Sequence, residues 1–186
     1  MMTRRSTLLL PLALAACASP EPAYYTLRAV PGLARSGGPH LVELRRPGIA
    51  GYLDRSEIVR GGGGYKLTLH AGERWGEPFG SMLARVLAED LNARLPGTTV
   101  FTASGSLSTE PNARVELDVP RFDLGQDGRV VLLAQVAVRE GLRRTQTRSL
   151  QLEATPASAS TADLVGAMSG LVGQAADAIA IMLRRR

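Results

Sequence analysis

The chain has little of the chemistry that metal sites and disulfide scaffolds use. Its 186 residues include one cysteine, Cys17, and two histidines, His40 and His70. A disulfide framework is therefore excluded, and a structural zinc site, which needs three or four Cys or His ligands, is nearly so. Aromatic residues make up only 4% of the chain, so its core must be built from Leu, Val and Ala. With 45% hydrophobic and 21% charged residues, the composition is that of one globular domain.

Lysine is also scarce, because Lys66 is the only one and arginine carries almost all of the positive charge. The formal net charge is +5, and basic proteins often bind nucleic acids or anionic lipids. Here the arginines are dispersed and few aromatic side chains are available to stack on bases. The sequence therefore argues against a nucleic-acid partner.

The first residues have the pattern of a lipoprotein signal. Arg4 and Arg5 precede an apolar run over 8–14, which is far shorter than the roughly 20 residues of a membrane span. Leu14-Ala15-Ala16-Cys17 then matches the bacterial lipobox, in which the cysteine thiol is acylated before cleavage. A plain secreted protein with an incidental cysteine is the alternative. The expected organisation is a signal peptide over 1–16, a lipidated tether over 17–23 and a folded domain over 24–186.

Acyl chains on Cys17 would anchor the mature protein firmly to a membrane. Ala18 follows the cysteine, so the aspartate that retains enterobacterial lipoproteins in the inner membrane is absent. We therefore expect the periplasmic side of the outer membrane. Cleavage before Cys17 also removes two arginines and lowers the net charge from +5 to +3.

Hydrophobic periodicity predicts two helices among several strands. Apolar residues spaced by three and four predict an amphipathic helix from Phe79 to Leu95, begun by Pro78, and a second from Ala162 to Leu183. On the first helix, the acid pair Glu89-Asp90 is expected on a solvated face. Alternating or continuous apolar runs predict strands at 24–27, 41–44, 56–60, 65–69, 98–102, 115–119, 130–139 and 145–154. This order predicts an α+β fold, in which an antiparallel-rich β-sheet packs against two amphipathic helices as a two-layer sandwich.

The motifs considered for phosphate binding and catalysis are incomplete in this sequence. Gly61 to Gly64 with Lys66 resembles a phosphate loop, but the following residues have the pattern of a strand where that loop requires a helix, so a hairpin tip is favoured. A Gly-x-Ser-x-Gly nucleophile elbow is missing. The small residues over 166–170 could pair membrane helices, but Asp163 and Asp177 favour a soluble helix packed on the sheet. We expect no enzyme activity, no cofactor and no metal.

Four segments carry a family resemblance and stand in the order of the family's motifs: Tyr24-Tyr25-Thr26-Leu27 soon after the lipobox, Gly51 to Arg60, Glu73 to Pro78, and Arg85 to Leu91. Together they resemble the ABC-type transport auxiliary lipoproteins of the PqiC-like group. The resemblance implies an auxiliary component of an MCE/ABC-type phospholipid transport system that maintains envelope integrity. Its partners would be an MCE-domain protein, a permease and an ATPase on other chains. Docking of the MCE protein at the outer membrane, by a ring-shaped homo-oligomer, would suit that role.

Six residues are the candidate functional residues: Cys17 for lipidation, and Tyr52, Leu53, Asp54, Arg55 and Trp75 for partner binding. A loop that mixes aromatic, apolar and charged residues is typical of interface hot spots. Alternatively, Tyr52 and Leu53 cap the core and Trp75 packs at the entry of the first helix. A second function stays open as well, a carrier lipoprotein that shields the acyl chain of a phospholipid between sheet and helices.

Overall fold

The computed structural model describes residues 21–61, 66–103 and 109–184, with the side chains of His70 and Ala71 left aside. Cys17 and most of the expected tether lie outside these residues. The described part forms one mixed sheet and two helices, in the order β1 (Ala23–Tyr25), β2 (Leu41–Leu44), β3 (Gly48–Ile49), β4 (Glu57–Gly61), β5 (Leu67–Trp75), α1 (Phe79–Arg94), β6 (Thr99–Thr102), β7 (Ala113–Leu124), β8 (Val130–Glu140), β9 (Gln146–Ala154) and α2 (Thr161–Leu183).

The long strand β7 organises the sheet. Along one side it pairs antiparallel with β8, which pairs antiparallel with β9. Along the other side β2, β3 and β4 each pair parallel with a different stretch of β7. Strand β6 joins β2 in parallel, β5 joins β4 as an antiparallel hairpin, and β1 joins β5 in parallel. The α+β prediction is therefore confirmed, with a sheet that is mixed because parallel pairs join the N-terminal strands to it.

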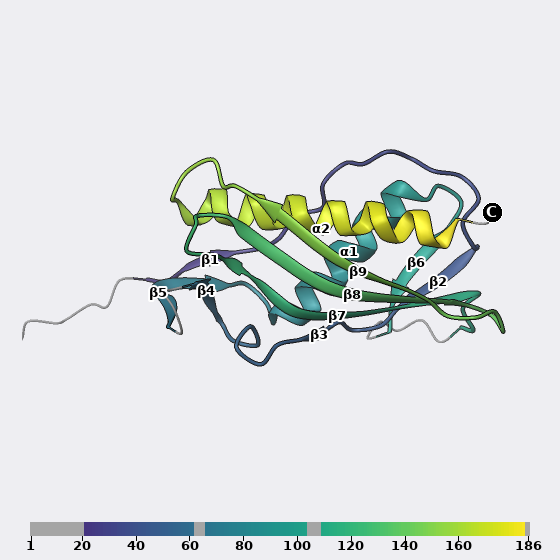
Figure 1. The fold of residues 1–186 in the computed structure, drawn as a ribbon, viewed down its shortest axis with the longest axis horizontal. Coiled ribbons are helices and arrows are strands. Elements are labelled where there is room, and N and C mark those ends of the chain that lie inside the picture. The colour runs from purple at the N-terminus through teal and green to yellow at the C-terminus, as the bar shows by residue number, and fades with distance from the viewer. Residues whose placement is uncertain (1–20, 62–65, 104–108, 185–186) are drawn as a thin grey trace, which may run out of the picture.

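Both helices form a second layer on one face of the sheet (Figure 1). Helix α2 contacts β8 and β9 as well as α1, and α1 also contacts β6. Alternate residues of β7 and β8 point into this layer and are buried, whereas their neighbours face solvent. The core cluster takes residues from both layers, so side chains occupy the space between sheet and helices.

The predicted helices are confirmed within one residue at their ends. Pro78 stands at the N-cap of α1, one position before the first helical turn in which proline was expected, and it makes no side-chain cap. In α2, Ser160 is the N-cap and its Oγ accepts a 3.1 Å hydrogen bond from the amide of Asp163. Helix α2 is long and apolar enough to span a membrane, but 67% of its most apolar window is buried inside the fold. This burial supports the prediction of a helix packed on the sheet.

Three details of the sheet escaped prediction. Strand β5 runs from Leu67 to Trp75, six residues beyond the end of the predicted 65–69. Strand β3 has only two residues, too few for a periodic signal, and the amide of Ala50 extends it with a 3.1 Å bond to the carbonyl of Val119. Strand β7 continues beyond the predicted 115–119, through an irregularity between Asp118 and Arg121. Pro120 lies in that interval and has no amide to donate, which suits a bulge.

The expected solvated face at Glu89-Asp90 is wrong for Asp90, which is 0% exposed. Its Oδ1 accepts a 3.0 Å bond from Arg94 Nη1 and a 2.8 Å bond from the amide of Val30. Arg94 is 1% exposed and also donates through Nε to Asp177 Oδ1 at 2.9 Å, which joins α1 to α2. The N-terminal segment around Val30 crosses over α1 and covers Asp90, and helical periodicity alone gives no sign of that segment. Asp90, Arg94 and Asp177 are called the buried charge cluster below.

Candidate functional site

The loop over 51–56 connects β3 to β4 and is held by its own turns. The amide of Leu53 donates to the carbonyl of Ala50 at 2.8 Å, and the amide of Asp54 donates to that of Gly51 at 3.3 Å. These bonds turn the chain back at Leu53, whose side chain is 4% exposed and joins the core cluster. Leu53 therefore anchors the loop, as the core-capping alternative proposed.

Tyr52 is half-buried and ties the same loop to β7. Its hydroxyl donates to Asp123 Oδ2 at 2.7 Å, while Arg121 Nε donates to Asp123 Oδ1 at 2.9 Å. Burial, the hydrogen bond to Asp123 and the charge of that carboxylate raise the pKa of Tyr52 well above its ordinary value of 10.0. The phenol is thus neutral at physiological pH, and its hydroxyl hydrogen is already donated to Asp123.

Trp75 ends β5 directly beside the end of this loop. Its amide donates to the carbonyl of Ser56 at 2.7 Å, which pins loop and strand together. The indole is 6% exposed and its ring centre lies 5.1 Å from that of Phe79, the first residue of α1. Phe79 in turn lies 5.9 Å from Phe122 on β7. This aromatic row fixes the entry of α1 against the sheet.

A hollow of about 360 Å³ opens where the loop meets the end of β5, and we call it the Trp75 hollow. Its lining residues come from two segments far apart in sequence, and they are Asp54, Arg55, Ser56, Trp75, Glu77 and Pro78. The structure therefore brings Asp54, Arg55 and Trp75 of the predicted residues together. Tyr52 and Leu53 do not line the hollow, but they fix its loop through the hydrogen bond to Asp123 and through the core.

The rim of the Trp75 hollow carries charged side chains on both sides, and the carboxylate of Glu77 on one side is held by hydrogen bonds. Glu77 accepts a 3.2 Å hydrogen bond from Arg85 Nε, and Arg85 Nη1 donates to Glu89 at 3.0 Å. The hydrogen bond to Glu77 is the main cause that raises the pKa of Arg85 above its ordinary value. Across the hollow, Arg55 Nε is buried and has no hydrogen-bond partner within the described part of the chain. The rim thus presents both signs of charge around an apolar floor.

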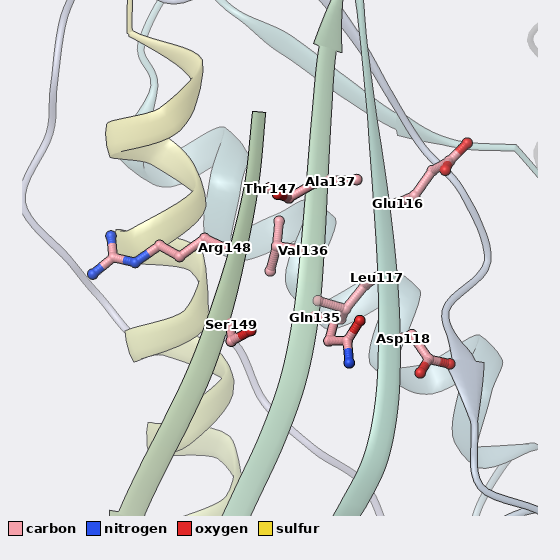
Figure 2. A pocket seen from close by; sticks show the side chains of 9 residues that line it. All are labelled: Glu116, Leu117, Asp118, Gln135, Val136, Ala137, Thr147, Arg148 and Ser149. Atoms are coloured by element: carbon pink, nitrogen blue, oxygen red, sulfur yellow. The ribbon is translucent and has the colours of Figure 1, made fainter. Parts of the chain in front are cut away.

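A larger hollow of about 560 Å³ lies on the β7–β8–β9 sheet and was not predicted (Figure 2). Figure 2 shows Glu116 and Asp118 on β7, Gln135 on β8 and the edge strand β9 with Arg148. Glu116 is half-exposed and pairs with Arg45 at 3.4 Å. The carboxylates at alternate positions of β7 were the sequence signal for this outward face. The residues that line this larger hollow include no aromatic side chain, whereas the Trp75 hollow has a tryptophan of the kind that often dominates binding at interfaces.

The other three residues that line the Trp75 hollow are Ser56, Glu77 and Pro78. The sequence analysis did not name them as binding residues, although they stand in the segments that carry the family resemblance. Strands β4 and β5 pair antiparallel on either side of the predicted hairpin tip at Gly61 to Gly64, and a strand rather than a helix follows Lys66. Most of the tip itself lies outside the described residues. Among the residues whose placement is described, no group of three or more His, Cys, Asp or Glu is arranged to hold a metal ion.

Comparisons with known proteins extend this picture. The profile of the ABC-type transport auxiliary lipoprotein component matches residues 25–180. One solved structure, of an uncharacterized protein, superposes with a TM-score of 0.73 at 20% identity and covers 88% of this chain and 99% of its own. That of XCC0632 from Xanthomonas campestris, assigned to DUF330, superposes with a TM-score of 0.68 at 16% identity and covers 86% and 93%. At these identities the two structures show a common fold. No curated protein matches the sequence.

Proposed function

Because the chain belongs to the ABC-type transport auxiliary lipoprotein family, we propose that it links an MCE-domain protein to the outer membrane within a phospholipid transport system. Membership makes it an envelope lipoprotein and an auxiliary component of an ABC transporter. The proposal adds the lipid on Cys17, the periplasmic side of the outer membrane and the MCE partner. A ring of several copies around that partner is part of the same proposal.

The Trp75 hollow is the observation that supports docking at this site. A buried tryptophan at the floor and opposite charges at the rim are typical of the centre of a protein interface. Arg55 lines the hollow and is partly exposed, so its guanidinium can meet an acceptor on a docked protein. Asp54 is exposed and presents the opposite charge beside it. Tyr52 and Leu53 keep both residues in place, which gives the predicted loop a positioning role.

The packed interior favours this adaptor over the lipid carrier. A carrier needs a cavity between sheet and helices that is long enough for an acyl chain. In the described structure, residues that would line such a cavity are core residues, among them Phe79, Leu87, Val115 and Leu171, each at most 1% exposed. An acyl chain could enter only if these residues repacked.

Pull-down from detergent-solubilised envelopes, using the full chain with a C-terminal tag, tests the proposal. We expect the MCE protein to co-purify with the wild-type protein and with Cys17→Ala, because the anchor does not form the protein interface. The double variant Asp54→Ala/Arg55→Ala should lose at least about 90% of the co-purified partner, as removal of two central charged residues costs more than about 1.4 kcal/mol.

The matched control is Asp127→Ala/Arg129→Ala. It removes another Asp–Arg pair, 3.3 Å apart and about half exposed, from the turn between β7 and β8. This control should retain the partner. Equal recovery with both double variants would contradict docking at the Trp75 hollow, and the absence of any MCE protein from the wild-type sample would contradict the proposed system.

A further inference from the structure

We propose that the outer face of the β4–β5 hairpin, with the adjoining β1, rests on the surface of an anionic phospholipid bilayer. The inference rests on the proposed lipid anchor at Cys17 and gives the domain a defined orientation on the membrane. The residues concerned are Tyr24, Lys66, Leu67, Leu69 and Arg74, which we call the hairpin patch.

Exposed apolar side chains are concentrated in the hairpin patch. Six large hydrophobic residues are exposed in the described structure, and three of them belong to β1 and β5: Tyr24 at 64%, Leu67 at 45% and Leu69 at 41%. Arg74 is exposed on β5 beside Tyr24, and Lys66 is exposed directly before β5, at the hairpin end of the patch. Apolar side chains flanked by cations suit the boundary between acyl chains and phosphate headgroups.

Strand geometry places the leucines of the patch on the face turned away from the helices. Arg60 on β4 points towards α2, because its Nη2 donates to Thr161 Oγ1 at 2.6 Å. Successive strand residues point to opposite faces, so Val59 and its ladder partner Leu69 face the other way, as does Leu67. Val59 agrees with this placement, since it is buried yet lies outside the core cluster.

Tyr24 and Arg74 extend the patch on the same face. Tyr25 and Trp75 are parallel ladder partners, and Trp75 packs against Phe79 in the core. The preceding pair, Tyr24 and Arg74, therefore points outward. Leu69 lies on the same face because the β4–β5 register shifts between them: Arg74 pairs with Glu57 and Leu69 with Val59, which are two residues apart on β4. The patch thus continues from the β4–β5 hairpin across to β1.

The proposed anchor leaves the fold next to this patch. Strand β1 runs parallel to β5 with Ala23 beside Glu73, so β1 begins next to the strand that carries Leu69 and Leu67. Figure 1 shows β1, β4 and β5 at the same end of the molecule. The segment from Cys17 to Ala23 spans at most about 20 Å when fully extended. Acyl chains on Cys17 would therefore hold the hairpin patch within reach of the bilayer surface.

Labelling of single cysteines in the lipidated protein tests this contact. Acylation uses the thiol of Cys17, the only cysteine, so an introduced cysteine is the one free thiol. Leu69→Cys and, separately, Leu67→Cys carry the environment-sensitive dye NBD. The control is Leu142→Cys, because Leu142 is fully exposed in the turn between β8 and β9, at the far end of the molecule (Figure 1). Each protein is reconstituted in phosphatidylcholine vesicles with phosphatidylglycerol, with and without nitroxide-labelled lipid.

We expect the emission of dye at 69 and 67 to shift to shorter wavelength and to be quenched by nitroxide lipid, whereas dye at 142 shows neither change. If all three labelled proteins bind the vesicles but the dye in each emits as it does in water, the inference is overturned and the lipid anchor still stands. A blue shift without nitroxide quenching would indicate contact with a second copy, and would also overturn it. Protein that fails to sediment with vesicles would overturn the lipid anchor and, with it, the inference.

Discussion

The buried charge cluster and the Trp75 hollow use the same kinds of side chain in opposite ways. In the cluster, Arg94 is 1% exposed and donates hydrogen bonds to Asp90 on α1 and to Asp177 on α2. Its charge is therefore paired within the fold and joins the two helices. In the hollow, Asp54 is exposed and Arg55 is partly exposed. The difference teaches that charge enclosed and paired by the fold contributes to stability, while charge left at a rim is available to a partner.

Removal of the central cation of the buried charge cluster should give the largest loss of stability. Arg94→Met leaves Asp90 buried without its counter-charge, which costs about 3–5 kcal/mol in the free energy of unfolding. Burial already raises the pKa of Asp90 above its ordinary value, although Val30 and Arg94 oppose that shift. Urea unfolding followed by circular dichroism measures the effect.

Two further variants sharpen that result. Arg85→Met removes an exposed arginine of α1 that also forms ion pairs, and should cost less than about 1 kcal/mol. Adding Asp90→Asn to Arg94→Met removes the unpaired charge and should recover part of the lost stability. Equal losses for Arg94→Met and Arg85→Met would contradict the division between the two regions.

A smaller effect is expected behind the Trp75 hollow. Tyr52→Phe removes one of the two side-chain hydrogen bonds that the carboxylate of Asp123 accepts from Tyr52 and Arg121, and should cost about 0.5–1.5 kcal/mol near neutral pH. Folding raises the pKa of Tyr52, so this stabilisation is fully present below pH 10.0, the ordinary value, and is lost as the pH rises above it. The difference in unfolding free energy between wild type and variant should therefore shrink at alkaline pH.

Tyr24→Phe serves as the control for that measurement, since Tyr24 is 64% exposed. Its unfolding free energy should stay within about 0.5 kcal/mol of wild type at neutral pH. A Tyr52→Phe difference that is constant up to strongly alkaline pH would show that the phenol is not held neutral by Asp123.

Local patterns predicted the elements but not the contacts between distant segments. Helix α1 followed from the spacing of Phe79, Met82 and Leu91, because apolar side chains at helical intervals share one face. The same reasoning misplaced Asp90, since the segment that covers it comes from around Val30, sixty residues earlier. Burial of a charge depends on such tertiary cover, which periodicity within one helix does not carry.

For the candidate site as well, the sequence predicted individual segments but not the contacts between them. The sequence named the loop over 52–55 and Trp75 separately, from composition and from the family resemblance. Their meeting depends on the bond between the Trp75 amide and the Ser56 carbonyl, which follows from the pairing of β4 with β5. Glu77 entered the site because Arg85, one turn and a half into α1, holds it there.

Site-specific photo-crosslinking in living cells tests docking at the Trp75 hollow most directly. A photoreactive amino acid is placed at Asp54, on the hollow, and separately at Thr147, which is also exposed but lines the larger hollow on the β7–β8–β9 sheet. We expect illumination to join the MCE protein to the chain labelled at 54 and not to the chain labelled at 147. An adduct at 147 with none at 54 would contradict the central claim.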